Sequence, residues 1–593
     1  MQASHSPVIV VGAGHAGLEA AFAAARVGAQ VVVVTGRLDT IGQTPCNPSI
    51  GGVAKGHLVH EIHALGGFMG IAADACAIHG RVLNLSKGPA VHSTRLQVDK
   101  RRYGEYARAA LLGHPGVTVV EGLVAAIEVD EERAAVTGVR LEDGRTIAAR
   151  AVVVTTGTFL GGLLHTGRRQ TPGGRVGEAP ALALSQQLQA LGFRLARLKT
   201  GTPPRLDPHS VDWERLEAQG SDDPFPRFSS PDEPTAPPRL PEVHCYITHT
   251  NEVVHQIIRD RIHESPMYSG QIEGIGPRYC PSIEDKVVRF ADRPRHQIFL
   301  EPEGLDPEAL IYPNGISTSL ATEVQEAMVA AIVGLERARI VRPGYAVEYD
   351  AVDARTLRHT LASKDIAGLH FAGQINGTSG YEEAGIQGLI AGANAALWLA
   401  ERPPLLIERD QGYAGVLVDD LVTVGCDEPY RMFTSRAEFR MQLREDNADA
   451  RLGELAHAAG LIDDARLDGL RRRLEQVDRC AEALARGREG EAWPDWIQRK
   501  ARARLVYAGY IERERREIAR IRGESGNLPL PADLDYFAIE GLNRESAERL
   551  ARVRPSSTAQ AGRIPGMTPG ALACVWAHAR LLRRRAPARA AGE

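Results

Sequence analysis

The sequence lacks the features that mark secreted and membrane-spanning proteins. Its seven cysteines are scattered and no two form a Cys-x-x-Cys pair, so a reducing compartment is expected rather than a disulfide framework. No apolar run approaches the roughly 20 residues that a membrane-spanning helix requires. The first residues contain neither the basic nor the apolar segment of a secretory signal. We therefore expect a cytoplasmic protein without a membrane segment.

An excess of positive charge is also missing. The 70 lysines and arginines are balanced by 74 aspartates and glutamates, which gives a formal net charge of −4. Nucleic-acid binding over a broad surface is therefore not indicated, and an RNA site has to be a local patch. At 593 residues the chain is too long for one hydrophobic core, and roughly two to four domains are expected.

What the chain does contain begins with a dinucleotide-binding fingerprint. The apolar strand Val8–Val11 runs into Gly12, Gly14 and Gly17, and a helical run and a second apolar strand follow. In this context the first glycine permits a tight turn, the second lets the backbone approach a pyrophosphate, and the third lets the helix pack on the strand. The acidic residue that usually contacts the ribose is missing, because the second strand ends in Thr35-Gly36-Arg37. The ribose contact is therefore left unassigned.

Two later segments are predicted to belong to the same module. Residues Ala151–Val154 form a continuous apolar run, which is typical of a strand buried on both faces. Residues Leu369–Gln374 form another strand, which contains a glycine near its end and precedes a long alanine-rich helix at 382–399. A flavin ring commonly lies at such a junction. The predicted fold class is α/β, with a Rossmann-type nucleotide-binding domain, an inserted α/β domain and an all-helical C-terminal domain.

Changes in composition set the expected domain boundaries. Proline-rich stretches interrupt the pattern after residue 200, and helix formers and arginines dominate after Pro403-Pro404. Thr568-Pro569 is predicted to be an N-cap followed by proline at the first position of a last helix. The expected domains are the first part of the nucleotide-binding domain at 1–200, the inserted domain at 201–350, the second part of the nucleotide-binding domain at 351–404 and the helical domain at 405–593.

Two cysteines stand in loops that suit a reactive thiol. Cys46 lies between two prolines, ahead of glycines and a helical run whose N–H groups favour a thiolate. The alternative is a small buried apolar residue. Cys280 is flanked by Arg278 and Lys286, which also favour a thiolate, while the acidic residues at 284–285 either accept a proton or cap the following helix. The other cysteines lack such neighbourhoods and are expected to be structural.

Three histidines, His57, His60 and His63, recur at three-residue spacing on one predicted helix. This spacing raises the possibility of a metal-binding face. No further cluster of histidine, cysteine or carboxylate completes a ligand set, and only His57 and Glu61 have the HxxxE spacing. We therefore predict no metal site and expect the surface of an amphipathic helix.

Arginines alternate with aromatic residues at 429–440, where Arg431, Arg436 and Arg440 stand among tyrosine and phenylalanine residues. Such a pattern suits a nucleic-acid surface, because arginines contact phosphates while aromatic rings stack on bases. Acidic residues dilute the patch, and ion pairing inside a helical core is an equally good explanation. The residues alone leave both alternatives open.

Strings along the whole chain together resemble the glucose-inhibited division protein A family. Members of this family are the flavin subunit of the enzyme that adds a carboxymethylaminomethyl or aminomethyl group to C5 of the wobble uridine (U34) of certain tRNAs. The strings occur in the family's order. They are Gly12-Ala13-Gly14-His15-Ala16-Gly17, Cys46-Asn47-Pro48-Ser49-Ile50-Gly51-Gly52, Arg278-Tyr279-Cys280-Pro281-Ser282-Ile283-Glu284-Asp285-Lys286, Tyr312-Pro313-Asn314-Gly315-Ile316-Ser317, Ala372-Gly373-Gln374-Ile375-Asn376-Gly377-Thr378 and Tyr430-Arg431-Met432-Phe433-Thr434-Ser435-Arg436.

The resemblance implies that the Rossmann-type domain binds FAD and that the inserted domain binds NADH. The implied FAD contacts are Gly12, Ala13, Gly14, His15, Ala16, Gly17, Val124, Ser185 and Gln374. The implied NADH contacts are Gly276, Pro277, Arg278, Tyr279, Cys280, Pro281, Ser282, Ile283, Glu284, Asp285, Lys286, Val287, Val288, Arg289 and Phe290.

The resemblance also implies partners and a reaction. A folate-binding GTPase would dock on the helical C-terminal domain and bring 5,10-methylenetetrahydrofolate, Arg431 and Arg436 would face tRNA, and the chain would form a homodimer within a heterotetramer. C5 of uracil is a poor nucleophile until a group adds at C6, so a thiolate from Cys46 or Cys280 is expected there.

Three rival functions stay open beside this one. A flavin- and folate-dependent tRNA 5-methyluridine methyltransferase shares the flavin module but is expected to lack a long helical C-terminal domain. A pyridine-nucleotide disulfide oxidoreductase would need a cysteine pair close in sequence, which this chain does not have. The third is a non-catalytic flavoprotein scaffold that presents tRNA.

Overall fold

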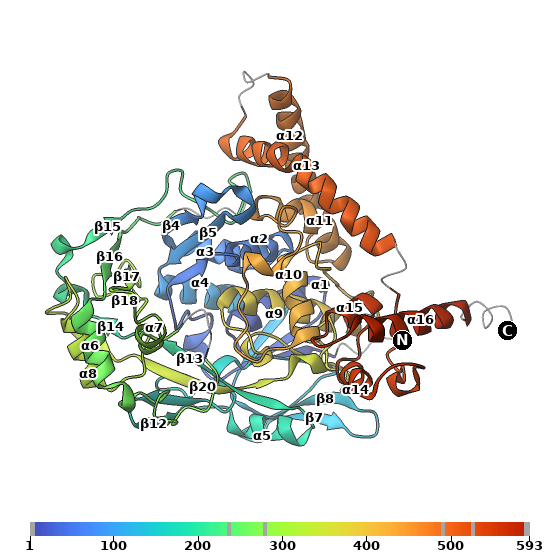
Figure 1. Cartoon of the computed structure of the whole chain (residues 1–593), viewed down its shortest axis with the longest axis horizontal. Coiled ribbons are helices and arrows are strands. Elements are labelled where there is room, and N and C mark those ends of the chain that lie inside the picture. Colours follow the sequence, from blue (N-terminus) through green and yellow to red (C-terminus); the bar gives the residue numbers. More distant parts are fainter. Residues whose placement is uncertain (1–5, 234–238, 277–280, 488–492, 524–527, 586–593) are drawn as a thin grey trace.

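The computed structural model describes residues 6–233, 239–276, 281–487, 493–523 and 528–585. At its centre lies a five-stranded sheet (Figure 1) in which all neighbouring strands run parallel. These strands are short and fully apolar at the middle of the sheet, as burial on both faces requires. In spatial order the strands are β21 (Leu369–Phe371), β10 (Ala151–Val154), β1 (Val8–Val11), β2 (Val31–Thr35) and β6 (Val117–Glu121).

Two helices with many small residues pack closely beside this sheet. They are α1 (His15–Val27) and α9 (Tyr381–Leu399). A Cβ atom added to Gly388 would lie 2.0 Å from the carbonyl oxygen of Ala16, and one added to Gly392 would lie 2.1 Å from that of Ala20. The two helices therefore approach so closely that only glycine fits at these positions of α9.

The other strands of the described residues form four further sheets. One has the order β3 (Ser49–Gly51), β5 (Ser93–Val98), β4 (Ala77–Leu83), and another has the order β7 (Val124–Asp130), β8 (Ala135–Leu141), β9 (Thr146–Ala148). A third has the order β12 (Arg169–Pro172), β11 (Leu163–Thr166), β20 (Tyr345–Val352), β13 (Leu195–Thr202). The fourth has the order β15 (Glu217–Gln219), β16 (Cys245–His249), β17 (Gln297–Pro302), β18 (Ile311–Asn314), β14 (Arg205–Leu206), β19 (Ile340–Arg342).

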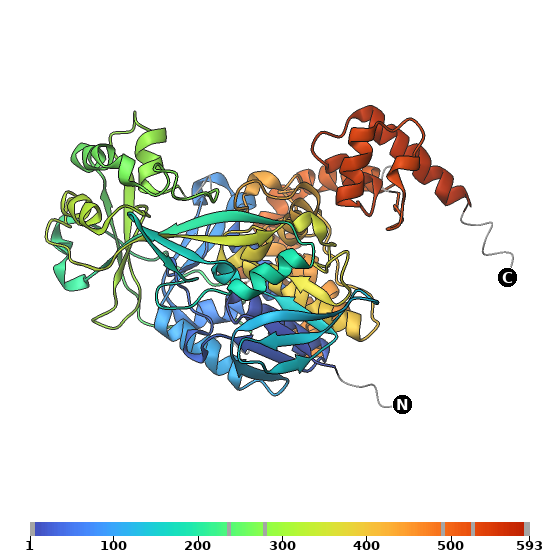
Figure 2. The ribbon, with the colours of Figure 1, turned by 90° about the horizontal axis from the view of Figure 1, so that it is seen from below.

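The six-stranded sheet belongs to a part of the molecule with its own hydrophobic core, which includes Leu300, Val324 and Met328. This part and the C-terminal bundle (residues 528–585, red) lie at opposite ends of the molecule (Figure 2). Strands β13 and β20 enclose it in the sequence and pair antiparallel from Leu195 with Val352 to Thr202 with Tyr345. We keep 201–350 as the proposed inserted domain, because these paired strands stand at both of its boundaries.

The remaining helices complete the fold, and the last third of the chain is largely helical. Helices α12 and α13 project from the body as a hairpin (Figure 1). Among the described residues no helix combines the length and apolar character needed to cross a membrane. The helices are α2 (Lys55–Ala64), α3 (Met69–Cys76), α4 (Lys100–Leu112), α5 (Leu182–Ala190), α6 (Glu252–Asp260), α7 (Ile283–Arg289), α8 (Thr322–Ala330), α10 (Tyr413–Asp419), α11 (Ala448–Ala459), α12 (Asp464–Ala485), α13 (Asp495–Gly523), α14 (Arg544–Val553), α15 (Thr558–Arg563) and α16 (Pro569–Arg585).

The structure confirms the predicted α/β fold class with its helical C-terminal region. Thr568 caps α16 as expected, since its Oγ1 accepts a hydrogen bond of 3.2 Å from the N–H of Ala571. The expectation for the histidine helix is wrong. Helix α2 is not a surface helix, because it packs against both α9 and α11, and His57 is fully buried. The Nε2 atom of His63 lies 3.0 Å from Oε2 of Glu233, so this nitrogen makes a hydrogen bond within the fold.

Candidate functional site

A cavity of about 620 Å³ opens where the carboxyl ends of β1, β2 and β10 meet. This edge is where parallel α/β sheets bind ligands. Residues of the fingerprint turn form one side of the cavity, and residues of the inserted part, including Lys286, Tyr312 and Asn314, form the other. The cavity therefore joins two segments that are far apart in the sequence.

Gly12 and Gly17 have the steric roles that the sequence predicted, and Gly14 borders open space. Gly12 has a φ of +103°, and a Cβ atom there would lie 2.7 Å from the carbonyl oxygen of Thr155. A Cβ atom on Gly17 would lie 1.9 Å from the carbonyl oxygen of Gly12, so glycine is required for the helix to pack on the turn. Gly14 lines the cavity, and a Cβ atom there would enter open space. The turn thus leaves the N-terminus of α1 accessible to a diphosphate.

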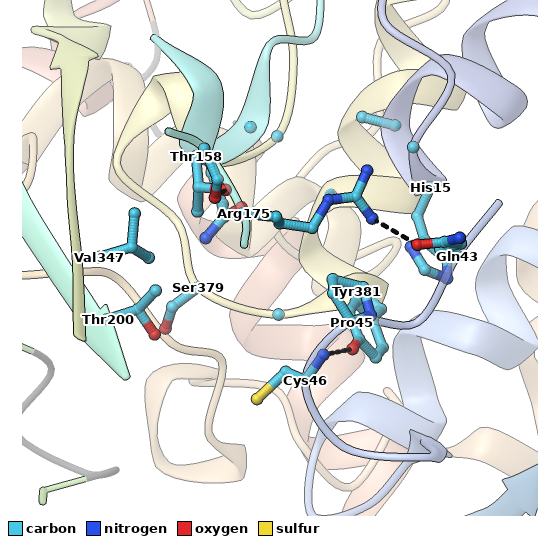
Figure 3. A pocket seen from close by; sticks show the side chains of 18 of the residues that line it. His15, Gln43, Pro45, Cys46, Thr158, Arg175, Thr200, Val347, Ser379 and Tyr381 are labelled. Atoms are coloured by element: carbon cyan, nitrogen blue, oxygen red, sulfur yellow. Dashed lines mark hydrogen bonds between the residues drawn. The ribbon is translucent and has the colours of Figure 1, made fainter. Parts of the chain in front are cut away.

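His15, the first residue of α1, stacks on Tyr381 with ring centroids 4.4 Å apart. Burial lowers the pKa of His15 to about 4, so this ring is neutral at physiological pH. The positive charge near the turn comes instead from Arg175, whose Nη1 donates a hydrogen bond of 3.1 Å to Gln43 beside His15 (Figure 3). Arg175 also pairs with Glu178 at 3.0 Å.

The end of β2 forms the part of the cavity where a ribose is expected. Thr35, Gly36 and Arg37 all line it. Glu178 also lines the cavity and interacts electrostatically with Arg37, so a carboxylate lies near this part of the cavity although the end of β2 carries none. Sequence reasoning missed Glu178, because it lies on a loop between β12 and α5 with no local motif.

Some of the residues implied as FAD contacts line the cavity, and others do not. Val124 and Gln374 line the cavity together with residues 12–16 of the fingerprint, whereas Gly17 does not line it within the described residues. Gly373, just before Gln374, has a φ of +89° and lies against Ala16 of α1. Ser185 does not line the cavity within the described residues. The hydroxyl of Ser185 donates a hydrogen bond of 2.6 Å to Asp350, which is not a lining residue of the cavity either.

Cys46 lies on the wall of the same cavity and is half-buried. Its backbone N–H donates a hydrogen bond of 2.8 Å to the hydroxyl of Tyr381 (Figure 3). Its carbonyl oxygen accepts hydrogen bonds from Lys100 at 3.1 Å and from Arg205 at 3.2 Å. Its Sγ lies 3.3 Å from the hydroxyl of Tyr312. The loop that carries the thiol is therefore contacted by residues of four different elements, α9, α4, β14 and β18.

Residues Pro277, Arg278, Tyr279 and Cys280 lie outside the described residues. In the rest of the implied NADH segment, Pro281 and Lys286 line the cavity. Ser282 caps α7, since its Oγ accepts a hydrogen bond of 3.3 Å from the N–H of Asp285.

The acidic residues of this segment serve the fold. Glu284 accepts hydrogen bonds from Thr318 and Ser319 at 3.0 and 3.1 Å, while Asp285 accepts one of 3.2 Å from Tyr268. Neither carboxylate lines the cavity within the part of the chain that the structure describes. Of the two roles considered for them, capping belongs to Ser282, and proton transfer in the cavity has no geometric support.

Arg431 and Arg436 have different environments. Arg431 lines the cavity. The guanidinium group of Arg436 lies 4.1 Å from the centroid of the Tyr430 ring, its Nε donates to the carbonyl oxygen of Arg431 at 3.0 Å, and its Nη1 lies 3.7 Å from Asp420. Ion pairing within the fold therefore describes Arg436, whereas Arg431 reaches the site.

The parallel sheet, the glycine turn and the cavity along it define a Rossmann-type dinucleotide-binding protein, and Arg37 and Gln374 both line its cavity. Residues 7–403 match the family model described as Glucose inhibited division protein A, and residues 517–593 match that of the tRNA modifying enzyme MnmG/GidA C-terminal helical bundle. The chain belongs to the glucose-inhibited division protein A (GidA) family of flavin-dependent tRNA modification enzymes.

Solved structures agree with this assignment. The chain is similar to GidA of Aquifex aeolicus in the form II crystal, with 41% identity and a TM-score of 0.90 over 98% of this chain and 99% of that one. In the form I crystal of the same protein, the identity is 43% and the TM-score 0.91 over 97% of this chain and 100% of that one.

Proposed function

We propose that this protein adds a carboxymethylaminomethyl or aminomethyl group to C5 of the wobble uridine of tRNA, using FAD and NADH. A folate-binding GTPase would deliver 5,10-methylenetetrahydrofolate. The observation that carries this proposal is that Cys46 lies in the same cavity as Gly14 and Gln374. A nucleophile for uracil C6 thus lies within the cavity that fits the flavin.

In the proposed reaction the Sγ of Cys46 forms a bond to C6, and the electron pair of the C5–C6 double bond moves to C5. C5 then forms a bond to the methylene carbon of the folate as one folate C–N bond breaks, and glycine or ammonium displaces the second folate nitrogen and becomes the amine substituent. Loss of the C5 proton and cleavage of the C6–S bond restore the double bond and the thiolate. When bound, FAD would exchange hydride with NADH, whereas the carbon transfer written above is redox-neutral and consumes no hydride itself.

The chain's own residues would bind and orient the substrates. Lys286 and Pro281 support NADH binding by the segment from Gly276 to Phe290, since both line the cavity. We keep Cys280 as the proposed second thiol because Pro281, the next residue in the sequence, lines the cavity. Arg431 would contact a tRNA phosphate at the cavity. The proposal also includes a cytoplasmic homodimer with the GTPase on the C-terminal helices.

Nucleoside analysis of tRNA tests the proposal. A strain that lacks this protein should lose the carboxymethylaminomethyl and aminomethyl uridines, and the wild-type gene should restore them. The Cys46→Ser and Cys280→Ser variants should keep bound FAD, seen in the absorbance spectrum, yet fail to restore the modified uridines. Loss of 5-methyluridine instead would identify the rival methyltransferase. Full restoration by Cys46→Ser would rule out its role as the nucleophile.

A further inference from the structure

We propose that Asn314, together with the neighbouring ammonium group of Lys286, forms the subsite that reads the Watson–Crick edge of the base and selects uridine over cytidine. In this subsite the Oδ1 of Asn314 accepts a hydrogen bond from N3–H of uracil, and Lys286 faces O4. The inference rests on the proposed function, because its ligand is the base that Cys46 would attack. It goes beyond that function by assigning the residues that choose the base.

Asn314 lies beside the thiol, on the same strand as the residue that contacts it. Tyr312 and Asn314 both belong to β18 and both line the cavity. Because they are two residues apart, they share one face of the strand, about 7 Å from each other along it. The hydroxyl of Tyr312 lies 3.3 Å from the Sγ of Cys46. In a pyrimidine, N3 lies directly across the ring from C6, so a base bonded to Cys46 through C6 would present its N3 edge on the side of Asn314.

A buried carboxylate fixes which end of the Asn314 amide faces the cavity. The Nδ2 of Asn314 donates a hydrogen bond of 3.3 Å to Oε1 of Glu301, which is fully buried and also pairs with Arg95. A carboxylate only accepts hydrogen bonds, so the NH₂ end of the amide has to face Glu301. The Oδ1 atom therefore points away from the carboxylate and is presented as an acceptor.

The wall offers this acceptor next to a cation. Within the described residues the Oδ1 of Asn314 accepts no hydrogen bond, and its side chain is half-buried at the cavity. The Nζ of Lys286, which also lines the cavity, donates a hydrogen bond of 2.7 Å to the carbonyl oxygen of Gly315, the next residue of the chain. A hydrogen-bond acceptor and a positive charge therefore stand side by side on this wall.

This pair of groups matches uracil and opposes cytosine. Enzymes that act on a nucleobase read it by hydrogen bonds to its Watson–Crick edge. Uracil presents the donor N3–H beside the acceptor O4, which suits the Oδ1 of Asn314 and the ammonium group of Lys286. Cytosine presents a bare N3 and an amino group, so a lone pair would face Oδ1 and an N–H donor would face the cation. Polar groups left unpaired in this way cost affinity.

The same arrangement suits the proposed addition to C6. When the Sγ of Cys46 bonds to C6, the electron pair of the C5–C6 double bond moves to C5 and is shared with O4 as an enolate. A cation placed at O4 stabilises this developing negative charge. Lys286 also belongs to the segment proposed for NADH, so the nicotinamide and the base would use this wall in turn.

The test is a binding titration of the full-length protein, loaded with FAD, against three anticodon stem-loop RNAs that differ only at position 34. The base there is uracil, cytosine or 3-methyluracil, which lacks the N3–H. The wild type should bind the uracil RNA about tenfold more tightly than the other two. Asn314→Ala should bind all three alike. Ser317→Ala is the matched control on the same wall and should keep the preference, because a hydroxyl both donates and accepts.

Equal binding of the three RNAs by the wild type would overturn the inference, and this comparison needs no folded variant. An intact preference in Asn314→Ala with normal FAD absorbance would overturn it too. If that variant instead showed only a raised KM for NADH, Asn314 would belong to the nicotinamide. Because binding needs neither folate nor the GTPase, these failures would leave the proposed reaction standing. Conversely, a uracil preference lost in Asn314→Ala, in a protein whose deletion changes no modified uridine, would support the subsite and contradict the reaction.

Discussion

Arg563 of α15 donates two hydrogen bonds, of 2.7 and 2.6 Å, to the carboxylate of Asp419 at the end of α10. His359 and Arg409 contact the same carboxylate, each at 3.1 Å. The C-terminal bundle has its own hydrophobic core, separate from that of the nucleotide-binding part. Its attachment at this point therefore depends on polar contacts around one buried carboxylate.

The Asp419→Asn substitution should loosen the C-terminal bundle. It leaves Arg563 and Arg409 without their shared charge, which costs about 1.5–3 kcal/mol. Hydrogen exchange should become faster across α14, α15 and α16 while the central sheet stays protected. Asp365→Asn is the control on the same side of the bundle, because the Asp365–Arg554 pair is exposed and worth at most about 1 kcal/mol. Equal exchange in both variants would contradict the assigned role of Asp419.

The attachment of the C-terminal bundle at Asp419 should also persist at mildly acidic pH. Burial acts to raise the pKa of Asp419, but hydrogen bonds from His359 and Arg563 outweigh it and hold the pKa well below the usual range. A carboxylate with a depressed pKa in the folded state gives its full stabilisation above the unfolded pKa of about 4 and loses it only as the pH falls further. Exchange protection of the bundle, corrected for the intrinsic rate, should stay constant between about pH 5 and pH 8. Loss of protection within that window would point to another titrating group.

Alanine at two fingerprint glycines should separate binding from stability. In Gly14→Ala the new Cβ enters open space in the cavity, so the protein should fold normally but bind FAD at least about tenfold more weakly. In Gly17→Ala the new Cβ meets the backbone of Gly12, so stability should fall by about 1–3 kcal/mol as well. Flavin fluorescence titration and thermal unfolding measure the two effects. A Gly14→Ala protein with wild-type affinity would show that the diphosphate does not approach this turn.

The arginines of the 429–440 segment should behave differently on substitution. Arg431→Ala should weaken tRNA binding and reduce the slope of log affinity against log salt by about one unit. Arg436→Ala removes the contact with the Tyr430 ring and should cost about 0.5–2 kcal/mol of stability. Binding titrations at several salt concentrations measure the effect on tRNA binding, and melting curves measure the effect on stability. An unchanged salt slope in Arg431→Ala together with a reduced slope in Arg436→Ala would reverse the assignment.

Glu178 should matter for the adenosine half of the cofactor alone. Glu178→Gln should lower the affinity for FAD about tenfold, since hydrogen bonds to charged groups contribute about 1.5–3 kcal/mol. The affinity for flavin mononucleotide, which has no adenosine, should not change. Glu105→Gln is the control, because Glu105 pairs with Arg101 at the surface and neither residue lines the cavity within the described part of the chain. Equal losses for both flavins would place Glu178 away from the ribose.

Local signals predicted the central part of the fold well. The strands at 8–11, 151–154 and 369–371 and the helix that ends at Leu399 follow from apolar runs and glycine spacing. The roles of Gly12 and Gly17 were also predictable, because each is a steric requirement between neighbours in the sequence. Cys46 could be singled out from its proline-flanked loop alone.

Contacts between distant segments could not be read from the sequence. Lys100, Arg205 and Glu303 meet across roughly a hundred residues or more of chain, and no periodicity encodes such a meeting. The burial of α2 was missed because polar histidines resemble a solvent face, whereas tertiary packing surrounds them. Ser185 was expected at the cofactor from its resemblance, but the turn of α5 directs its hydroxyl to Asp350.

The hydrogen bonds from Arg205 to the carbonyl oxygens of Pro45 and Cys46 have a mechanical consequence. Arg205 belongs to β14 in the six-stranded sheet, whereas its acceptors follow the first turn of the nucleotide-binding part. A rotation of the part that contains the six-stranded sheet, about the paired strands β13 and β20, would therefore displace the loop that carries Cys46. Cys46 lies near the start of the chain, yet its loop is held in part by a residue of the six-stranded sheet that lies 159 residues later.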